Sequence, residues 1–283
     1  MSRTVTIVRT GPQALVQDLG RPGHAHLGVP PSGAVDPHSL KLANRLVGNR
    51  EGAACLELLL GGLAVRAGAS CTAAVTGPSV EVRVNGALAD SHHPLHLGAG
   101  DVLEIGTPRT GLRSYLALSG GVDVPEELGS RSTDLLSGIG PDPLRDDDVL
   151  PLGSPGPACG ADVVPPHHAP HRLQLPLRLG PRDDWFADAE TQLRRGSWTV
   201  SDRSNRVGAR LHGTALTRRD GEIPSEGMVT GAVQVPPDGQ PVVFLNDHPT
   251  TGGYPVIGVV DHDHLRFLGQ ARPGTVVTFR PVG

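Results

Sequence analysis

Carboxylates, arginines and small hydroxyl residues gather in four polar segments of the sequence that glycines interrupt. The first, "VQDLGRPGHAHLGVPPSGAVD", contains Gln17, Asp18, Arg21, Ser32 and Asp36. Asp18 is a candidate acid or base, and Arg21 and Ser32 are candidate substrate ligands. An Asp–Arg ion pair that only stiffens the loop remains an equal alternative, and Asp36 is suited to cap a helix.

The second segment, "SDRSNRVGARLHG", places Asn205, Arg206 and Arg210 just after an expected strand. A guanidinium presents a rigid fork of donors that matches carboxylate or phosphate, and an amide side chain can bind a carbonyl or an amine. These three residues are therefore candidate ligands for a small anionic or amide substrate. Pairing of the arginines with surface aspartates is the alternative.

The third segment, "SEGMVTGAVQVPPDGQP", reads in part as a strand in which Gln234 shares a face with Thr230 and Ala232. Gln234 could therefore line a cavity. Glu226 is a spare carboxylate for acid or base catalysis if burial adjusts its pKa, whereas an exposed loop glutamate would have no such role.

The fourth segment, "NDHPTTGGYPVIGVVDHDH", contains Asp247, a third candidate acid or base, and continues into a Thr-Thr-Gly-Gly turn. Such a turn exposes successive backbone N–H groups and two hydroxyls, and its glycines let a ligand approach the main chain. A hairpin turn that needs glycine only for its backbone angles is the alternative. The candidate ligands here are Thr250, Thr251, Gly252, Gly253 and Tyr254.

The end of this segment, "DHDH", invites comparison with a metal site, because imidazole and carboxylate are both metal ligands. If the strand continues here, alternation sends His262 and His264 to one face and Asp261 and Asp263 to the other. A third ligand would have to come from elsewhere. We therefore expect a polar strand end and no metal on this chain.

Short strands at roughly 8 to 12 residue spacing must position these segments, which favours a mainly β fold with a barrel or sandwich. Asp36, Pro37 and the apolar spacing that follows predict a helix over Pro37–Val47, and a shorter helix is expected over Asp183–Leu193. Seven prolines fall in residues 151–176, which reads as an extended connection. The expected domains are residues 1–150 and 177–283.

Composition excludes several kinds of protein. A formal charge of -4 without a basic stripe makes nucleic acid an unexpected partner, and no apolar run is long enough to cross a membrane. Cys55, Cys71 and Cys159 are widely spaced and odd in number, which fits a reducing cytoplasm better than a disulfide framework. Lys41 is the only lysine, so a P-loop, a biotin attachment motif and a Ser-Lys nucleophile pair are disfavoured.

Taken in order, the four segments resemble one family across nearly the whole chain, together with "LELLLGG", "YLALSGGVDVP" and "LGSRST". It is the family that contains the C subunit of 5-oxoprolinase, KipA and allophanate hydrolase subunit 2, and it is similar to part of the carboxyltransferase region of urea carboxylase. The resemblance implies a cyclophilin-like β-barrel architecture. It also implies a working unit that is completed by a partner like KipI or the B subunit of 5-oxoprolinase.

The resemblance implies three functions. In the first, the chain is part of a complex that hydrolyses 5-oxo-L-proline to L-glutamate with ATP, in which the A subunit of 5-oxoprolinase also takes part. In the second it is a KipA-type regulatory protein that binds a KipI-like partner without chemistry. In the third it is a carboxyltransferase component acting on urea or a related amide, with biotin carried by another chain.

The sequence departs from the family pattern after "GSRST". A Gly-rich stretch is usual there, whereas this chain has "DLLSGIGPDPLRDDDVLPLG", with Pro141, Pro143 and the acidic run Asp146–Asp148. Any contacts that the family makes through this loop are expected to differ here.

Overall fold

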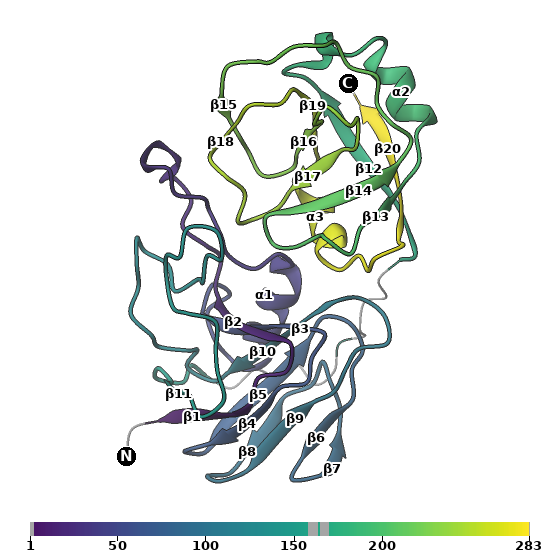
Figure 1. Ribbon diagram of the computed structural model, residues 1–283. Coiled ribbons are helices and arrows are strands. Elements are labelled where there is room, and N and C mark those ends of the chain that lie inside the picture. Colours follow the sequence, from purple (N-terminus) through teal and green to yellow (C-terminus); the bar gives the residue numbers. More distant parts are fainter. Residues whose placement is uncertain (1–2, 158–163, 165–169, 283) are drawn as a thin grey trace. The chain divides into compact units, whose positions relative to one another are not determined.

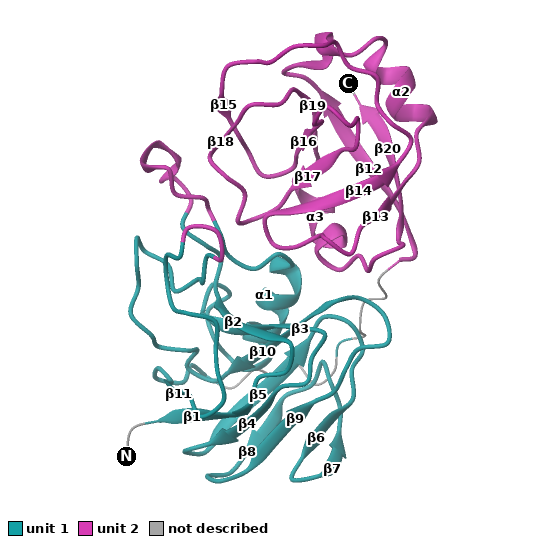
Figure 2. Cartoon of the chain, viewed as in Figure 1, with its two compact units in different colours: residues 1–21, 32–134, 138–169 teal, residues 22–31, 135–137, 170–283 magenta. Residues whose placement is uncertain are grey.

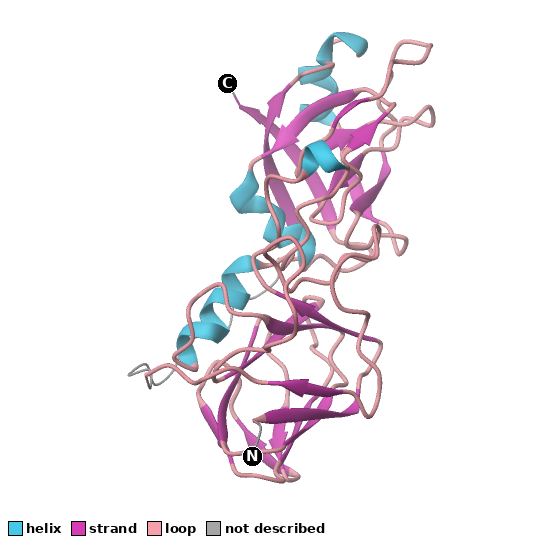
Figure 3. Ribbon diagram, turned by 90° about the vertical axis from the view of Figure 1, so that its left-hand side faces the viewer, coloured by secondary structure: helices cyan, strands magenta, loops and turns pink. Residues whose placement is uncertain are grey.

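The computed structural model describes residues 3–157, 164 and 170–282, and it is mainly β with few, short helices, as the sequence predicts (Figure 1, Figure 3). The chain forms two compact units (Figure 2). Unit 1 consists of residues 1–21, 32–134 and 138–169, and unit 2 of residues 22–31, 135–137 and 170–283.

Unit 1 contains two antiparallel sheets with a shared apolar core. The six-stranded sheet has the order β11-β1-β4-β9-β6-β7, and the five-stranded sheet has the order β2-β3-β10-β5-β8. Valine, leucine and alanine side chains fill the core, and the turn at Asn85 and Gly86, both at positive φ, joins β6 to β7. The strands are β1 (Thr4–Arg9), β2 (Gln13–Gln17), β3 (Cys55–Leu59), β4 (Ala64–Ala67), β5 (Cys71–Thr76), β6 (Val82–Val84), β7 (Ala87–Ala89), β8 (Leu95–Leu97), β9 (Val102–Ile105), β10 (Arg113–Leu118) and β11 (Val149–Pro151).

Helix α1 (Pro37–Leu46) is the one helix of unit 1 among the described residues, and it confirms the prediction from its start signals. Asp36 accepts a hydrogen bond from the Ser39 N–H at 3.1 Å, and Pro37 occupies the first turn. Leu40, Ala43 and the helix's other apolar residues pack in a core cluster with Tyr115 of β10. The helix is thereby fixed against the five-stranded sheet.

Unit 2 is built on a closed seven-stranded barrel of order β12-β19-β16-β17-β14-β13-β20. Its last strand, β20, closes it by pairing in parallel with β12 and antiparallel with β13. Inside, Trp198 and Phe279 lie with ring centroids 5.2 Å apart. The barrel strands are β12 (Arg172–Leu179), β13 (Trp198–Val200), β14 (Gly208–Gly213), β16 (Ala232–Gln234), β17 (Val242–Phe244), β19 (Val256–Val260) and β20 (Val276–Val282), and β15 (Glu226–Gly227) pairs with β18 (Thr251–Gly252) in a separate small sheet.

Two local predictions in unit 2 are wrong. The single helix expected over Asp183–Leu193 is a 3-10 turn, η2 (Asp183–Trp185), followed by α2 (Ala189–Arg195). Phe186 between them is extended, and Asp188 adopts a left-handed backbone with φ 51° while its carboxylate caps α2 at Thr191. These two residues break the helix.

The "DHDH" stretch is the second correction. Strand β19 ends at Val260, and Asp261 is the N-cap of α3 (His262–Gly269), so the four residues do not alternate across a strand. The Asp261 carboxylate accepts from the Asp263 N–H at 3.1 Å and contacts His264 Nδ1 at 3.0 Å. The hydrogen bond with His264 lowers the pKa of Asp261 below its ordinary value. Both bonds join the N-cap Asp261 to residues in the first turn of α3.

The proline-rich stretch is shorter than expected, because Pro151 ends β11 and β12 already begins at Arg172. Much of it, including Cys159, lies outside the described residues. No helix within residues 3–157 or 170–282 has the length and apolar character that crossing a membrane requires.

Candidate functional site

The turn over Thr250–Tyr254 stands beside the barrel and joins the third and fourth sequence segments. Strand β18 pairs with β15 so that Gly252 lies opposite Glu226, and the Met228 N–H donates to the Thr250 carbonyl at 2.9 Å. Gln234 Nε2 donates to the Tyr254 carbonyl at 3.1 Å. The structure thus brings Glu226 and Gln234 to the turn.

Backbone donors of this turn are available to a ligand. Within the described residues, the N–H groups of Thr250, Gly253 and Tyr254 have no acceptor. Gly253 and Tyr254 are exposed. Unpaired N–H groups on neighbouring residues can bind a carboxylate or a developing oxyanion.

At Gly252 an added side chain would approach neighbouring side chains, whereas the backbone angles there do not call for glycine. A Cβ at this position would lie 2.6 Å from Gln234 Nε2 and 3.3 Å from the Met228 side chain. Gln234 is buried and held by its bond to Tyr254, so it could not move aside without losing that bond. At Gly253, by contrast, a Cβ would meet nothing within 4 Å.

Glu226 forms an ion pair with Arg182, a residue outside the four polar segments of the sequence. Arg182 Nε donates to the two carboxylate oxygens at 2.9 and 3.1 Å, and Nη2 also contacts Oε1. The hydrogen bonds from Arg182 lower the pKa of Glu226 below its ordinary value. Glu226 is therefore not tuned as a general acid, and its carboxylate instead fixes β15 beneath the turn.

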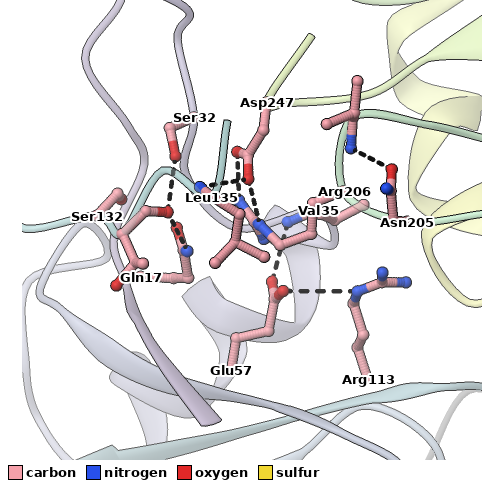
Figure 4. Close-up of polar contacts among 12 residues, drawn as sticks. Gln17, Ser32, Val35, Glu57, Arg113, Ser132, Leu135, Asn205, Arg206 and Asp247 are labelled. Atoms are coloured by element: carbon pink, nitrogen blue, oxygen red, sulfur yellow. Dashed lines mark hydrogen bonds and ion pairs between the residues drawn. The ribbon is translucent and has the colours of Figure 1, made fainter. Parts of the chain in front are cut away.

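Arg206 and Asp247 form a buried ion pair between the second and fourth segments (Figure 4). Arg206 Nε donates to Asp247 Oδ2 at 2.8 Å and Nη2 donates to Oδ1 at 2.9 Å, with both side chains almost fully buried. The Asp247 N–H returns a bond to the Arg206 carbonyl, and the Leu135 N–H approaches Oδ2 at 3.4 Å. Such a bidentate pair orients both loops and leaves Asp247 as a positioning group.

His248, next to Asp247, is a buried residue for which the spacing of the fourth segment offered no signal. Its Nδ1 lies 2.8 Å from the Pro249 carbonyl oxygen, and its Nε2 lies 3.1 Å from Thr230 Oγ1. A carbonyl oxygen only accepts, so Nδ1 carries the proton, and in the neutral imidazole Nε2 is the acceptor of the Thr230 hydroxyl. This pair can move a proton between a half-exposed hydroxyl and a buried base.

Asn205 and Arg210 do not join the turn through any contact within the described part of unit 2. The Asn205 Oδ1 accepts from the Val207 N–H at 2.9 Å and the Gly208 N–H at 3.3 Å, so the side chain shapes its own loop (Figure 4). Arg210 points outward from β14 and lines a separate cavity. Only alternation along β14 could have revealed that orientation from the sequence.

In unit 1, Asp18 is held by four donors. Its carboxylate accepts from the hydroxyls of Ser130 and Ser132, each at 2.6 Å, and from the N–H groups of Gly20 and Arg131, each at 2.7 Å. These bonds fix the loop after β2 to the "GSRST" segment. Because four donors already bond its carboxylate, Asp18 has a structural role.

Arg21 and Ser32 bind the same stretch of main chain. Arg21 Nη2 donates to the Ser132 carbonyl, and Ser32 Oγ donates to the Thr133 carbonyl at 3.1 Å. Gln17 Nε2 donates to the Thr133 carbonyl as well, at 2.8 Å (Figure 4). Ser32 has a left-handed backbone, φ 51°, which a non-glycine residue adopts only when its surroundings impose it.

A second buried network in unit 1 centres on Glu57, within "LELLL" (Figure 4). The Glu57 carboxylate accepts from the Tyr115 hydroxyl at 2.7 Å and the Val35 N–H at 3.1 Å, and it lies 3.5 Å from Arg113 Nε. Burial and the neighbouring carboxylate raise the pKa of Tyr115 well above its ordinary value. A glutamate inside an apolar run was the available signal for this network.

The acidic run Asp146–Asp148, in the segment that departs from the family pattern, bonds to its own loop and to the start of the chain. Asp146 accepts from the Thr10 N–H at 2.9 Å, and Asp148 accepts from the Arg145 N–H at 2.7 Å. The Asp148 carbonyl accepts from the Ile7 N–H, beside β11. The run therefore holds its loop against the first strand of the chain.

No three His, Cys, Asp or Glu side chains lie together as metal ligands within the described ranges.

Comparison with known families gives one match over most of the chain. The family model described as "Carboxyltransferase domain, subdomain A and B" matches residues 27–281. It includes every candidate site residue except Asp18 and Arg21.

Relatives and solved structures agree with this match. The chain is 40% identical to the C subunit of 5-oxoprolinase from Escherichia coli (strain K12), over 96% of this chain and 89% of the relative. It is 33% identical to urea amidolyase of Lachancea kluyveri, over 98% of this chain but only 17% of that protein. The crystal structure of TTHA0988 matches with a TM-score of 0.90 and 36% identity, over 99% of this chain and 56% of that one.

Proposed function

The chain belongs to the family of the carboxyltransferase domain, subdomains A and B, and on that premise we propose that it is one component of an ATP-dependent 5-oxoprolinase complex. The observation that carries the proposal is the similarity to the C subunit of 5-oxoprolinase over 96% of this chain and 89% of the relative. The complex would hydrolyse 5-oxo-L-proline to L-glutamate. Its other members would be the B subunit of 5-oxoprolinase, or a KipI-like protein, and the A subunit.

The Thr250–Tyr254 turn fits the needs of lactam opening. Attack on an amide carbonyl places negative charge on oxygen, and N–H donors that are already oriented stabilise this charge without reorganisation. The N–H groups of Thr250, Gly253 and Tyr254 lack acceptors within the described residues and would supply such donors. Gln234 and the Arg182–Glu226 pair would hold the turn in place.

Proton transfer falls to His248 rather than to the carboxylates that the sequence suggested. Asp18 is used by four donors, Glu226 is paired with Arg182, and Asp247 is paired with Arg206. His248 Nε2 accepts from the Thr230 hydroxyl when the ring is neutral, so it would serve as the base and Thr230 as the half-exposed end of the relay. ATP would enter through the complex, and no step on this chain is assigned to it.

The test is glutamate release from 5-oxoproline by the purified complex of this chain with its two partner proteins. We expect ATP-dependent release, and a His248→Gln variant with kcat lowered by roughly 100-fold or more, in line with loss of a general base. Thr230→Ser should keep most of the activity and Thr230→Val should not. A complex that assembles but releases no glutamate would leave a regulatory role of the KipA type.

A second candidate function is carboxyl transfer, which the family description and the similarity to urea amidolyase favour. Biotin would be carried by another chain, because Lys41, the only lysine, lies within α1 rather than in a hairpin turn. Avidin separates the two candidates. Inhibition by avidin of a urea-dependent reaction would support carboxyl transfer, whereas avidin should not affect glutamate release.

A further inference from the structure

A groove on the outer surface of the barrel contains two arginines that the proposed function does not use. The groove has a volume of about 530 Å³, and its floor is formed by the neighbouring strands β13, β14 and β17. Arg210 and His212 project from β14 into it, because they alternate with the buried Ala209 and Leu211. The loops around Arg203 and Asp238 form its walls.

The guanidinium groups of Arg203 and Arg210 have no acidic partner. No carboxylate in the described part of the chain lies within ion-pair distance of either one. Arg203 bonds through its backbone, with its N–H donating to Ser201 Oγ at 3.2 Å, and the Arg210 N–H donates to Ser204 Oγ at 3.0 Å. These backbone bonds hold the two loops in place, and the guanidinium groups of Arg203 and Arg210 can still bind a ligand.

Two carboxylates also line the groove, but each takes part in a local turn. Asp238 Oδ1 accepts from the Gln240 N–H at 3.0 Å, and Asp202 Oδ1 accepts from the Ser201 hydroxyl at 3.2 Å. Gln240 in turn exchanges hydrogen bonds with the main chain of Gly213, at 2.8 and 3.3 Å. These bonds build the walls and do not neutralise the arginines directly.

We propose that this groove is a binding site for a small metabolite bearing a phosphate or carboxylate group, held jointly by Arg203 and Arg210. A guanidinium fork matches the oxygens of either group, and two arginines that line one cavity of this size suit a small metabolite better than a protein surface. The site is separate from the Thr250–Tyr254 turn and does not depend on the proposed function.

The experiment is a titration of the whole chain, labelled with ¹⁵N, with inorganic phosphate in one arm and glutarate in the other. Binding in the groove should shift the backbone signals of Arg203, Arg210 and His212 and should saturate. Arg203→Gln and Arg210→Gln should each weaken binding roughly tenfold, as expected for loss of a charge-assisted hydrogen bond. The matched control is Arg195→Gln, which removes an exposed arginine on α2 outside the groove.

Saturation by phosphate alone or glutarate alone supports the site and identifies the group that it takes. Saturation by neither overturns the proposal. So does a loss of affinity in Arg195→Gln equal to that in the groove variants, because binding would then follow overall charge. All three side chains are exposed, so spectra of the variants should otherwise superimpose on the parent spectrum.

Discussion

At the scale of single residues, the three carboxylates that the sequence suggested as acids or bases have structural roles. They hold loops and strands in place through hydrogen bonds and ion pairs. Asp18, Glu226 and Asp247 each accept at least three hydrogen-bond or ion-pair contacts. His248 is a buried residue whose ring nitrogen faces a half-exposed hydroxyl, and its partners Thr230 and Pro249 hold its tautomer. Whether such a residue has a structural role or could transfer a proton depends on the groups that surround it and not on its residue type.

Removing one member of the Arg206–Asp247 pair should be strongly destabilising. Asp247→Ala removes the bidentate carboxylate partner of a buried guanidinium, for which a cost of about 3–5 kcal/mol is expected in the free energy of unfolding. The double variant Arg206→Met/Asp247→Leu should recover much of that loss, because no buried charge remains. Urea unfolding of the whole chain measures both.

The control for this pair is Asp184→Asn, which breaks an exposed contact with Arg219 at 3.9 Å. It should change stability little, since exposed ion pairs contribute little. An Asp247→Ala variant as stable as this control would contradict the prediction.

The Arg182–Glu226 pair should make stability depend on pH in the acid range. The pKa of Glu226 is lowered in the folded protein, so its contribution is fully present above the ordinary value of 4.5 and is lost as the pH falls through the folded pKa. The parent chain should therefore be more stable than Glu226→Gln at pH 7, and the difference should disappear at acid pH. Glu222→Gln, on an exposed residue, serves as the control and should show no such trend.

At the scale of elements, the Thr250–Tyr254 turn depends on packing contacts among short strands. β18 pairs with β15, Met228 follows β15, and Gln234 reaches the turn from the end of β16. The turn is shaped on one side by these side chains and is open at Gly253. Its two glycines therefore have different roles.

Gly252→Ala should impair the turn, whereas Gly253→Ala should not. The added methyl at Gly252 meets Gln234 Nε2 and must break its bond to Tyr254, a loss of about 0.5–1.5 kcal/mol. If the turn binds substrate, glutamate release by the complex should fall by roughly tenfold, which corresponds to about 1.4 kcal/mol. Equal activity of the two variants would show that the turn is not part of the site.

The elements that the sequence predicted well are those with local signals. Asp36, Pro37 and the spacing of Leu40 and Ala43 define α1 without help from the rest of the chain. The start of α3, which Asp261 caps, was not predicted, because the apolar run before it favoured a continuing strand. Because Leu265 and Leu268 are the only buried leucines in α3, its amphipathic pattern was too short to outweigh that run.

The site was less predictable because its contacts join distant positions. Arg182 lies 44 residues from Glu226, and Arg206 lies 41 residues from Asp247. Residue type and spacing pointed to Glu226 and Asp247 as candidate acids or bases and to Arg206 as a candidate ligand, each by itself, and did not point to Arg182. The tertiary fold decides which charged side chains form ion pairs. Neighbouring residues in one sequence carry no signal for such pairs.

At the scale of the whole molecule, the two units carry separate reporters of their folding. Both tryptophans, Trp185 and Trp198, belong to unit 2. Cys55 is fully buried in unit 1, and burial raises the pKa of its thiol far above the usual range. Tryptophan emission therefore follows unit 2, and reactivity of Cys55 follows unit 1.

We expect the two signals to give different urea midpoints, because each unit has its own core. The measurement uses a Cys71→Ser/Cys159→Ser background, in which Cys55 is the remaining thiol, with a thiol reagent at mildly alkaline pH. Cys55 should stay unreactive until unit 1 unfolds. Coincident transitions would instead show that the chain unfolds in one cooperative step.

Closure of the barrel by β20 has a consequence for synthesis on the ribosome. Strand β20 lies between β12, the earliest strand of the barrel, and β13, and its register with β12 runs from Arg172 opposite Val276 to Arg178 opposite Val282. Translation at about 5–20 residues per second leaves β12 without this neighbour for several seconds. During that interval β12 has an exposed edge without its partner, so the nascent barrel is a part of this protein that a chaperone would protect.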